Sequence, residues 1–137
     1  MWLPRENEMA DLKPGAVLYA KNLGLVSHFY QHVAGLDIVR VEKDHVVLVS
    51  KSMELIVLQV PAPLAQTIDV ESPPKRRTDT PIKLVFPISS ISEARVTAAL
   101  HQGELDPPEH QWEFQGCLVC DGHDPEGNVI QFRENVI

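Results

Sequence analysis

Asp124-Pro-Glu-Gly-Asn-Val-Ile-Gln-Phe-Arg133 is the stretch of sequence that decides the fold. Its first half has the composition of a turn. Pro125 presets φ at the second turn position, and Gly127 can adopt the left-handed conformation that closes a hairpin with a bulge. Asn128 tolerates the same conformation. The stretch therefore predicts a tight turn that leads directly into a C-terminal strand.

The second half of this stretch alternates between apolar and polar side chains. Ile130 and Phe132 are apolar, whereas Gln131 and Arg133 are polar, and this period of two indicates a strand. We expect the apolar side to pack against a helix. The polar side then faces the other way, and a polar row on a short strand is typical of a surface that faces a ligand.

The chain before this stretch contains one arrangement of elements twice. In the first half, a strand at Gly15–Lys21 is followed by the helix cap Asn22 and by a helix that runs to about Ala34 and ends at Gly35. Three further strands are expected after this helix, at Leu36–Glu42, His45–Ser50 and Met53–Val60.

The second half repeats this order. The strand Ile82–Ile88 precedes a capping box, in which Ser90 bonds forward and Glu93 bonds back, and a helix that continues to Gly103. A short edge strand is expected within Glu104–Glu109, followed by strands at Trp112–Asp121 and Val129–Arg133.

The two halves also have the same spacing. Gly15 and Gly35 are 20 positions apart (35 − 15), as are Lys83 and Gly103 (103 − 83). A repeat of one supersecondary unit organises a fold. The sequence thus predicts an α+β protein of two βαβββ modules, whose sheets share a cup and carry their helices outside. We place a tail at 1–14, the first module at 15–60, a linker at 61–81 and the second module at 82–137, together forming one domain.

The linker contains the basic run Lys75-Arg76-Arg77. This run could be an anion site or a solvated loop. No aromatic residue is interleaved with it, which favours the loop.

Composition narrows the classes of partner. The chain has 137 residues, 44% of them hydrophobic, and a formal net charge of -7. Binding to a nucleic-acid backbone depends on clustered Lys and Arg, so a nucleic-acid partner is not expected. No apolar run has the length of a membrane span. Met1–Leu12 lacks the apolar core of a secretory signal, and with two cysteines the chain is expected in a reducing cytoplasm.

Several of these motifs together resemble the vicinal oxygen chelate superfamily. They are Phe29-Tyr30 on the first helix, Gly35-Leu36 after it, and the Asp124–Asn128 turn before the closing strand. This superfamily includes glyoxalase I, extradiol dioxygenases, fosfomycin-resistance enzymes and metal-free bleomycin-binding proteins. The resemblance covers nearly the whole chain from Gly15 onward. It implies a glyoxalase-like cup of two βαβββ modules, usually in a homodimer.

The resemblance also implies where metal ligands would lie in the metal-dependent members. Three of the four matched positions fall on Gly15, Lys83 and Gln131, and the fourth-strand position falls near Glu54 or Gln59. A divalent ion needs several deprotonated N or O ligands. A protonated Lys83 about 4 Å from a dication would oppose binding by roughly 8 kcal/mol at an effective dielectric of about 20. No cofactor is therefore expected, and Glu54 and Gln131 are the only weak metal candidates.

Ligand-binding residues are then expected on the inner face of the cup. The candidates are Tyr19, Lys83, Trp112, Gln131 and Arg133, with Val17, Val85 and Phe114 on the same inner walls. An apolar, aromatic-lined hollow with a few converging polar groups is typical of a small-molecule pocket. Its two cations favour an anionic or carbonyl-bearing ligand. The alternative is that both cations only satisfy the interior, by pairing with Glu54, Glu113 or Glu134.

Two other patterns have the spacing of a metal or redox motif but are not expected to form such a site. Cys117 and Cys120 have the spacing of a redox or zinc motif, but residues three apart in a strand point to opposite faces. Two ordinary buried cysteines are expected. His28 and His32 have the i, i+4 spacing of metal-binding histidines, but no acidic motif joins them, which favours surface histidines. His123 precedes the turn and could line the mouth of the cup.

Three functions remain open from the sequence. The first is a metal-independent protein that binds a small molecule in the cup. The second is a divalent-metal-dependent lyase, isomerase or dioxygenase that uses Glu54 and Gln131. The third is an enzyme without metal, in which Lys83 or Tyr19 acts as acid or base and would need a shifted pKa.

Overall fold

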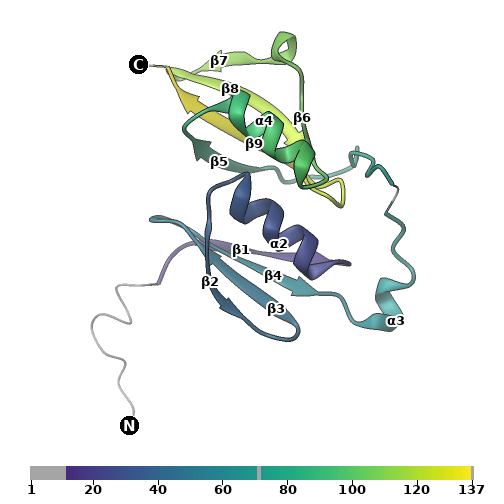
Figure 1. Ribbon diagram of the computed structural model, residues 1–137. Coiled ribbons are helices and arrows are strands. Elements are labelled where there is room, and N and C mark those ends of the chain that lie inside the picture. Colours follow the sequence, from purple (N-terminus) through teal and green to yellow (C-terminus); the bar gives the residue numbers. More distant parts are fainter. Residues whose placement is uncertain (1–11, 71, 137) are drawn as a thin grey trace.

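The computed structural model describes residues 12–70 and 72–136, which form two β-sheets, each with one long helix (Figure 1). Of the expected tail, residues 1–11 lie outside the described part. The first module contains β1 (Gly15–Ala20), α2 (Leu23–His32), β2 (Asp37–Val41), β3 (His45–Val49) and β4 (Glu54–Gln59). Its strands lie in the order β1-β4-β3-β2, with β1 parallel to β4.

The second module has the same plan with a broken edge. It contains β5 (Leu84–Ile88), α4 (Ile91–Leu100), β6 (Glu104–Leu105), the 3-10 helix η1 (Pro108–His110), β7 (Trp112–Phe114), β8 (Cys117–His123) and β9 (Val129–Asn135). The strand order is β5-β9-β8-β6, β5 is parallel to β9, and β7 also pairs with β8. The predicted α+β class with two modules is therefore confirmed. The second module has one strand more than the expected β-α-β-β-β order, because β7 and β8 are separate strands.

The prediction of one strand over Trp112–Asp121 was wrong. The chain turns at Gln115 and Gly116, where φ is 49° and 76°, and so forms the β7–β8 hairpin in place of a single strand. Between the modules, the linker has one short helix, α3 (Ala62–Ala65). None of the helices within the described residues has the length and apolar character needed to span a bilayer.

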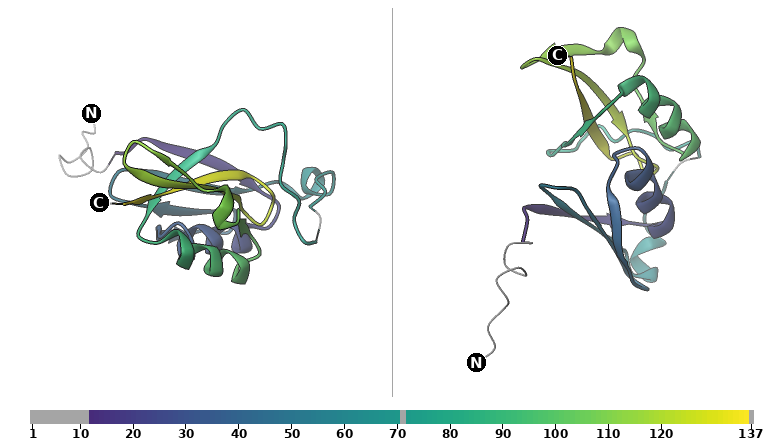
Figure 2. Two further views of the ribbon diagram at one scale, coloured as in Figure 1. Left: turned by 90° about the horizontal axis from the view of Figure 1, so that it is seen from above. Right: turned by 60° about the vertical axis from the view of Figure 1, so that its left-hand side comes forward.

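Both long helices cover the same side of the sheets (Figure 2, left). The core beneath them is an aromatic row that crosses from one module to the other. Tyr30 of α2 lies 5.6 Å from Phe86 of β5, and Phe86 lies 6.1 Å from Phe132 of β9, measured between ring centroids. All three side chains are fully buried, and each contributes about 1.5–3 kcal/mol from burial alone. The row therefore joins the two modules into one core.

The Asp124–Asn128 turn fastens the second module to the start of α2. The Glu126 carboxylate accepts hydrogen bonds from the backbone N–H groups of Lys21 and Asn22, both at 2.8 Å. Gly127 has φ +82°, and a Cβ there would lie 2.1 Å from the carbonyl oxygen of Lys75. Only glycine fits such a close approach, so the turn also holds the linker in place.

The linker's basic run is consequently attached to the protein. Arg76 forms an ion pair with Asp106, and the backbone N–H of Arg77 donates to the carbonyl oxygen of Gly127 at 2.8 Å. Lys75 and Arg77 have exposed side chains. The expectation of a free solvated loop holds for these two side chains but not for Arg76.

The helix-free side of the sheets carries exposed apolar side chains. On β1, Ala16, Leu18 and Ala20 pack into or against the core, whereas Val17 and Tyr19 are 54% and 64% exposed. The second module exposes a comparable set on this side: Val85, Trp112 and Phe114. Alternation along the strands thus produces the inner face that the sequence predicted.

Candidate functional site

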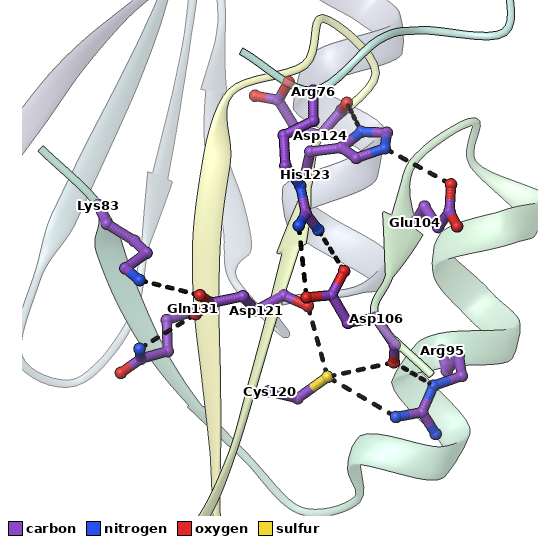
Figure 3. A network of polar contacts seen from close by, with 10 residues as sticks. All are labelled: Arg76, Lys83, Arg95, Glu104, Asp106, Cys120, Asp121, His123, Asp124 and Gln131. Atoms are coloured by element: carbon purple, nitrogen blue, oxygen red, sulfur yellow. Dashed lines mark hydrogen bonds and ion pairs between the residues drawn. The ribbon is translucent and has the colours of Figure 1, made fainter. Parts of the chain in front are cut away.

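The most connected polar group on this inner face is centred on Asp121 of β8. The hairpin places Asp121 opposite Gln131 of β9, and the Gln131 amide donates to Asp121 Oδ1 at 3.1 Å. Lys83, which immediately precedes β5, donates to Asp121 Oδ2 at 2.9 Å. Figure 3 shows all three side chains converging beside β8 and β9. One carboxylate thus joins three strands.

Arg133 extends this group along β9. Its Nε donates to Gln131 Oε1 at 2.9 Å, and its guanidinium carbon lies 5.2 Å from the centroid of the Phe114 ring. A cation over an aromatic face within about 6 Å is favourable. Trp112 pairs in register with Val119, which in turn pairs with Arg133. The cluster therefore has an aromatic wall at the β7 end.

The electrostatics of the cluster leave a positive surplus. Lys83 and Arg133 carry two positive charges and Asp121 carries one negative charge. Gln131 is buried, whereas the side chains of Lys83 and Asp121 are 39% and 21% exposed. Solvent-borne molecules can therefore reach the ion pair, while the amide beneath it is held in a fixed orientation.

The structure brings together most of the residues that the sequence nominated. Lys83, Gln131 and Arg133 form one hydrogen-bonded chain, and Trp112 lies on the neighbouring strand. Tyr19 lies on the other sheet, in register with Leu58, and its hydroxyl joins none of these bonds among the described contacts. The site residues remain a prediction, in which Tyr19 is the outlying member.

The alternative expectation, that Lys83 and Arg133 pair with nearby glutamates, names the wrong partner for Lys83. Lys83 is indeed paired, but with Asp121 rather than with Glu54, Glu113 or Glu134. Glu134 instead accepts a hydrogen bond from the backbone N–H of Ile91 at 2.6 Å, at the start of α4.

Asp121 belongs to this cluster, although it is not among the site residues expected from the sequence. A signal was present, because Asp121 and Gln131 each lie three residues outside the Asp124–Asn128 turn (124 − 121 and 131 − 128). Residues at equal distance from a hairpin turn face each other across the strands. The pattern of a single strand does not contain this pairing and therefore does not indicate the carboxylate.

The positions that the resemblance matched to metal ligands do not fit a divalent ion here. Gly15 offers no donor, and a Cβ there would lie 2.2 Å from the carbonyl oxygen of Glu54. Lys83 is a cation in an ion pair, and Gln131 is a neutral amide. The Gln59 side chain bonds to the backbone of Lys21 at 2.8 Å. Within residues 12–70 and 72–136, no group of three or more His, Cys, Asp or Glu is placed to hold a metal ion.

The cysteines and histidines behave in different ways. Cys117 and Cys120 are free thiols, and burial raises the pKa of Cys120. His28 and His32 are exposed, as expected. The ring of His32 is stacked on that of His101, with a centroid distance of 4.6 Å. His123 is buried, and its contacts lie outside the cluster around Asp121.

No protein-family model matches the sequence, and no curated protein sequence matches it significantly. Solved structures do match. A glyoxalase/bleomycin resistance protein/dioxygenase family enzyme from Burkholderia phytofirmans has a TM-score of 0.66 at 17% identity, over 90% of this chain and 97% of that one. An integron cassette protein from the mobile metagenome of V. cholerae has a TM-score of 0.59 at 14% identity, over 97% and 98% of the two chains.

A mutant of the fosfomycin resistance protein FosX from Listeria monocytogenes also matches, with a TM-score of 0.61 at 12% identity, over 93% of this chain and 94% of that one. That structure is complexed with Mn(II) and 1S,2S-dihydroxypropylphosphonic acid. This chain has the same fold as these proteins, that of the vicinal oxygen chelate superfamily.

Proposed function

We propose that this chain, which has the vicinal oxygen chelate fold, binds a small anionic or carbonyl-bearing molecule on the inner face of its second sheet without a divalent metal. Lys83 and Arg133 would bind the negative or carbonyl oxygen atoms. Trp112 and Phe114 would contact the apolar part of the molecule, and Tyr19 would approach from the other sheet.

The chain of bonds from Lys83 through Asp121 and Gln131 to Arg133 is the observation that supports this proposal. It fixes two cations on one face and satisfies the single carboxylate between them. The cluster therefore presents donors that are held in position before a ligand arrives. Preorganised donors lower the entropic cost of binding an oxyanion.

Trp112 offers a direct readout of this site. The chain has two tryptophans, so a Trp2→Phe background leaves Trp112 as the sole indole. We expect phenylphosphonate or benzoylformate to change Trp112 fluorescence in a saturable way. Lys83→Met and Arg133→Met should each weaken binding by about tenfold, because each removes a hydrogen bond from a charged group.

Lys51→Met is the matched control, since Lys51 is exposed in the link between β3 and β4. It should leave the titration unchanged. Equal affinities of all three methionine variants would show that the cations do not form the site, and the proposal would fail.

The divalent-metal-dependent alternative gains one observation. Asp121 is a carboxylate in the cluster that the sequence analysis did not count, and Glu54 lies on β4 with a half-buried side chain. If Lys83 moved away, Asp121 and Gln131 would offer two oxygen ligands. A lyase, isomerase or dioxygenase reaction would then require Mn(II) or a similar ion, and protein purified without chelator would contain one ion per chain.

A homodimer is part of the same proposal. The inner face leaves Val17, Tyr19, Val85, Trp112 and Phe114 exposed on a single chain. A second copy placed over this face would exclude water from them and would close the cup. We also propose that the protein works in a reducing cytoplasm, which its two free thiols favour.

A further inference from the structure

A second cavity lies away from the cluster around Asp121. It has a volume of about 970 Å³ and lies between the linker, α4 and the segment that follows α4. Its apolar walls include Pro73, Pro107 and Pro108, and its ionisable lining residues are Arg95, Glu104 and His123. In Figure 3, Glu104 and Arg95 lie on the α4 side of β8, whereas Lys83 and Gln131 lie on the other side. The cavity and the proposed cup share none of these residues.

His123 contributes a buried acceptor to this cavity. Its Nδ1 lies 3.0 Å from the backbone carbonyl oxygen of Asp124, and its side chain is 7% exposed. A carbonyl oxygen can only accept, so Nδ1 carries the ring proton and donates. In the neutral ring, Nε2 then has a free lone pair.

Glu104 places a second acceptor beside the first. Its Oε2 lies 3.6 Å from His123 Nε2, which is longer than a hydrogen bond. Glu104 pairs with His123 across β6 and β8, so the backbone fixes both side chains on the same face. Its side chain is 71% exposed. Two acceptors therefore face one region, and a donor placed between them would bond to both.

The guanidinium group of Arg95, which also lines the cavity, bonds to other parts of the protein. Arg95 Nε donates to the backbone oxygen of Asp106 at 2.9 Å, and Arg95 Nη2 donates to the Gln111 side chain and to Cys120 Sγ. These bonds hold the guanidinium against the protein, as Figure 3 shows for Asp106 and Cys120. Among the described contacts, the Glu104 carboxylate lies 3.6 Å from His123 Nε2 and makes no ion pair with Arg95.

We propose that this cavity binds a small primary amine with a compact apolar ring. The ammonium group donates to His123 Nε2 and Glu104 Oε2, and the ring packs against the proline walls. An anion would face the Glu104 carboxylate and a lone pair, so it does not fit. The volume is within the range of about 300–1,000 Å³ that is usual for small-molecule sites.

Benzylamine is the probe that tests this proposal. In an ¹H–¹⁵N NMR titration of the full chain, we expect saturable shifts at the amides of Gln102, Gly103 and Leu105, which line the cavity. Glu104→Gln should weaken benzylamine about tenfold, because a hydrogen bond to a charged group is lost. Glu104 is exposed, so this substitution should leave the fold intact.

Two comparisons make the test specific. Benzoate has the same ring with the opposite charge and should bind at least tenfold more weakly than benzylamine. Glu109→Gln alters an exposed carboxylate on η1 and should leave benzylamine affinity unchanged. Equal affinities for benzylamine and benzoate, no benzylamine binding, or no loss in Glu104→Gln would each overturn the proposal. Because Lys83 and Arg133 lie outside the cavity, none of these results would decide the function of the cup.

Discussion

Asp124 shows how one side chain can organise a turn that the sequence already predicts. Its carboxylate is fully buried and accepts hydrogen bonds from the Tyr30 hydroxyl, the Asn128 amide and the backbone N–H groups of Glu126 and Asn128. Burial raises the pKa of Asp124, while these four bonds act in the opposite direction. Burial, followed by the charge of the Asp124 carboxylate, raises the pKa of Tyr30.

Asp124→Asn should therefore destabilise the protein by about 1–3 kcal/mol, because one acceptor becomes a donor that faces other donors in a buried site. The free energy of unfolding in urea measures this change. Asp79→Asn, at an exposed linker position, is the control and should change stability little. A loss of stability no greater than that of the control would show that the buried bonds do not hold the turn.

For single residues, the sequence indicated on which face of a strand a side chain lies, but not which residue it bonds to. Alternation along 129–133 correctly gave Gln131 and Arg133 a common face, since they are joined by a hydrogen bond. It could not identify Asp121, because the partner of Lys83 comes from a different strand. Pairing across strands depends on register, which single-strand patterns do not contain.

At the scale of elements, the local caps of the two long helices could be predicted from the sequence, but the acceptors from distant parts of the chain could not. Local caps were predicted correctly: Asn22 accepts from the backbone N–H of Leu25 at 3.1 Å, and Ser90 accepts from that of Glu93 at 3.2 Å. Other backbone N–H groups at the two helix starts donate to acceptors on distant strands and turns. Those of Lys21 and Asn22, just before α2, donate to Glu126, and that of Ile91 in α4 donates to Glu134. The reciprocal bond from Glu93 is not among the contacts of the described residues. Tertiary caps of this kind have no local sequence signature.

Glu126→Ala should weaken the start of α2, because two backbone N–H groups lose their acceptor. A cost of about 1–2 kcal/mol is expected, the magnitude usual for a lost helix cap. Amide hydrogen exchange at Leu23–Val26 should accelerate more than exchange in α4. Glu109→Ala, at an exposed position, should have neither effect. Uniform acceleration in both helices would argue against a local cap.

The contact between α2 and the end of α4, where His32 stacks on His101, should make the stability of the protein depend on pH. Burial, followed by the charges of His32 and His28, lowers the pKa of His101 from 6.5. The unfolded chain therefore binds this proton more readily than the folded chain does. The resulting stability is fully present above about pH 6.5 and is lost as the pH falls through the lowered folded-state pKa.

Urea unfolding between pH 7.5 and 5 tests this expectation. His101→Gln should reduce the pH dependence, whereas His110→Gln, at an exposed position, should preserve it. Identical pH profiles for the two variants would mean that the stacked pair of His32 and His101 does not cause the pH dependence of stability.

The whole molecule follows from duplication of one unit, and this was the most predictable level. Two matched intervals of strand, cap, helix and glycine were enough to predict the α+β class and the shared face. The broken edge at β7 escaped prediction because Gln115 has no turn preference in the sequence, yet adopts positive φ. The second cavity also escaped it, because its walls come from the linker, α4 and β8 together.

If a second copy of the chain covers the inner face, the protein should be a dimer in solution. In sedimentation velocity the protein should have about twice the chain mass of 15.3 kDa. Val17→Asp places a charge on the inner face and should shift the protein toward monomer. Val96→Asp makes the same change on α4, where Val96 is 64% exposed, and should not. A monomeric parent protein, or equal behaviour of the two variants, would exclude this face as the interface.

We propose that Lys83 and Gln131, two positions matched to metal ligands by the resemblance, are joined through Asp121 into a group that does not hold a divalent ion. Electron paramagnetic resonance of Mn(II) titrated into chelator-treated protein tests this claim most directly, because free and bound ions give different signals. We predict that the added Mn(II) remains free at micromolar concentrations. Binding of one equivalent of Mn(II) that disappears in Gln131→Ala would contradict the account.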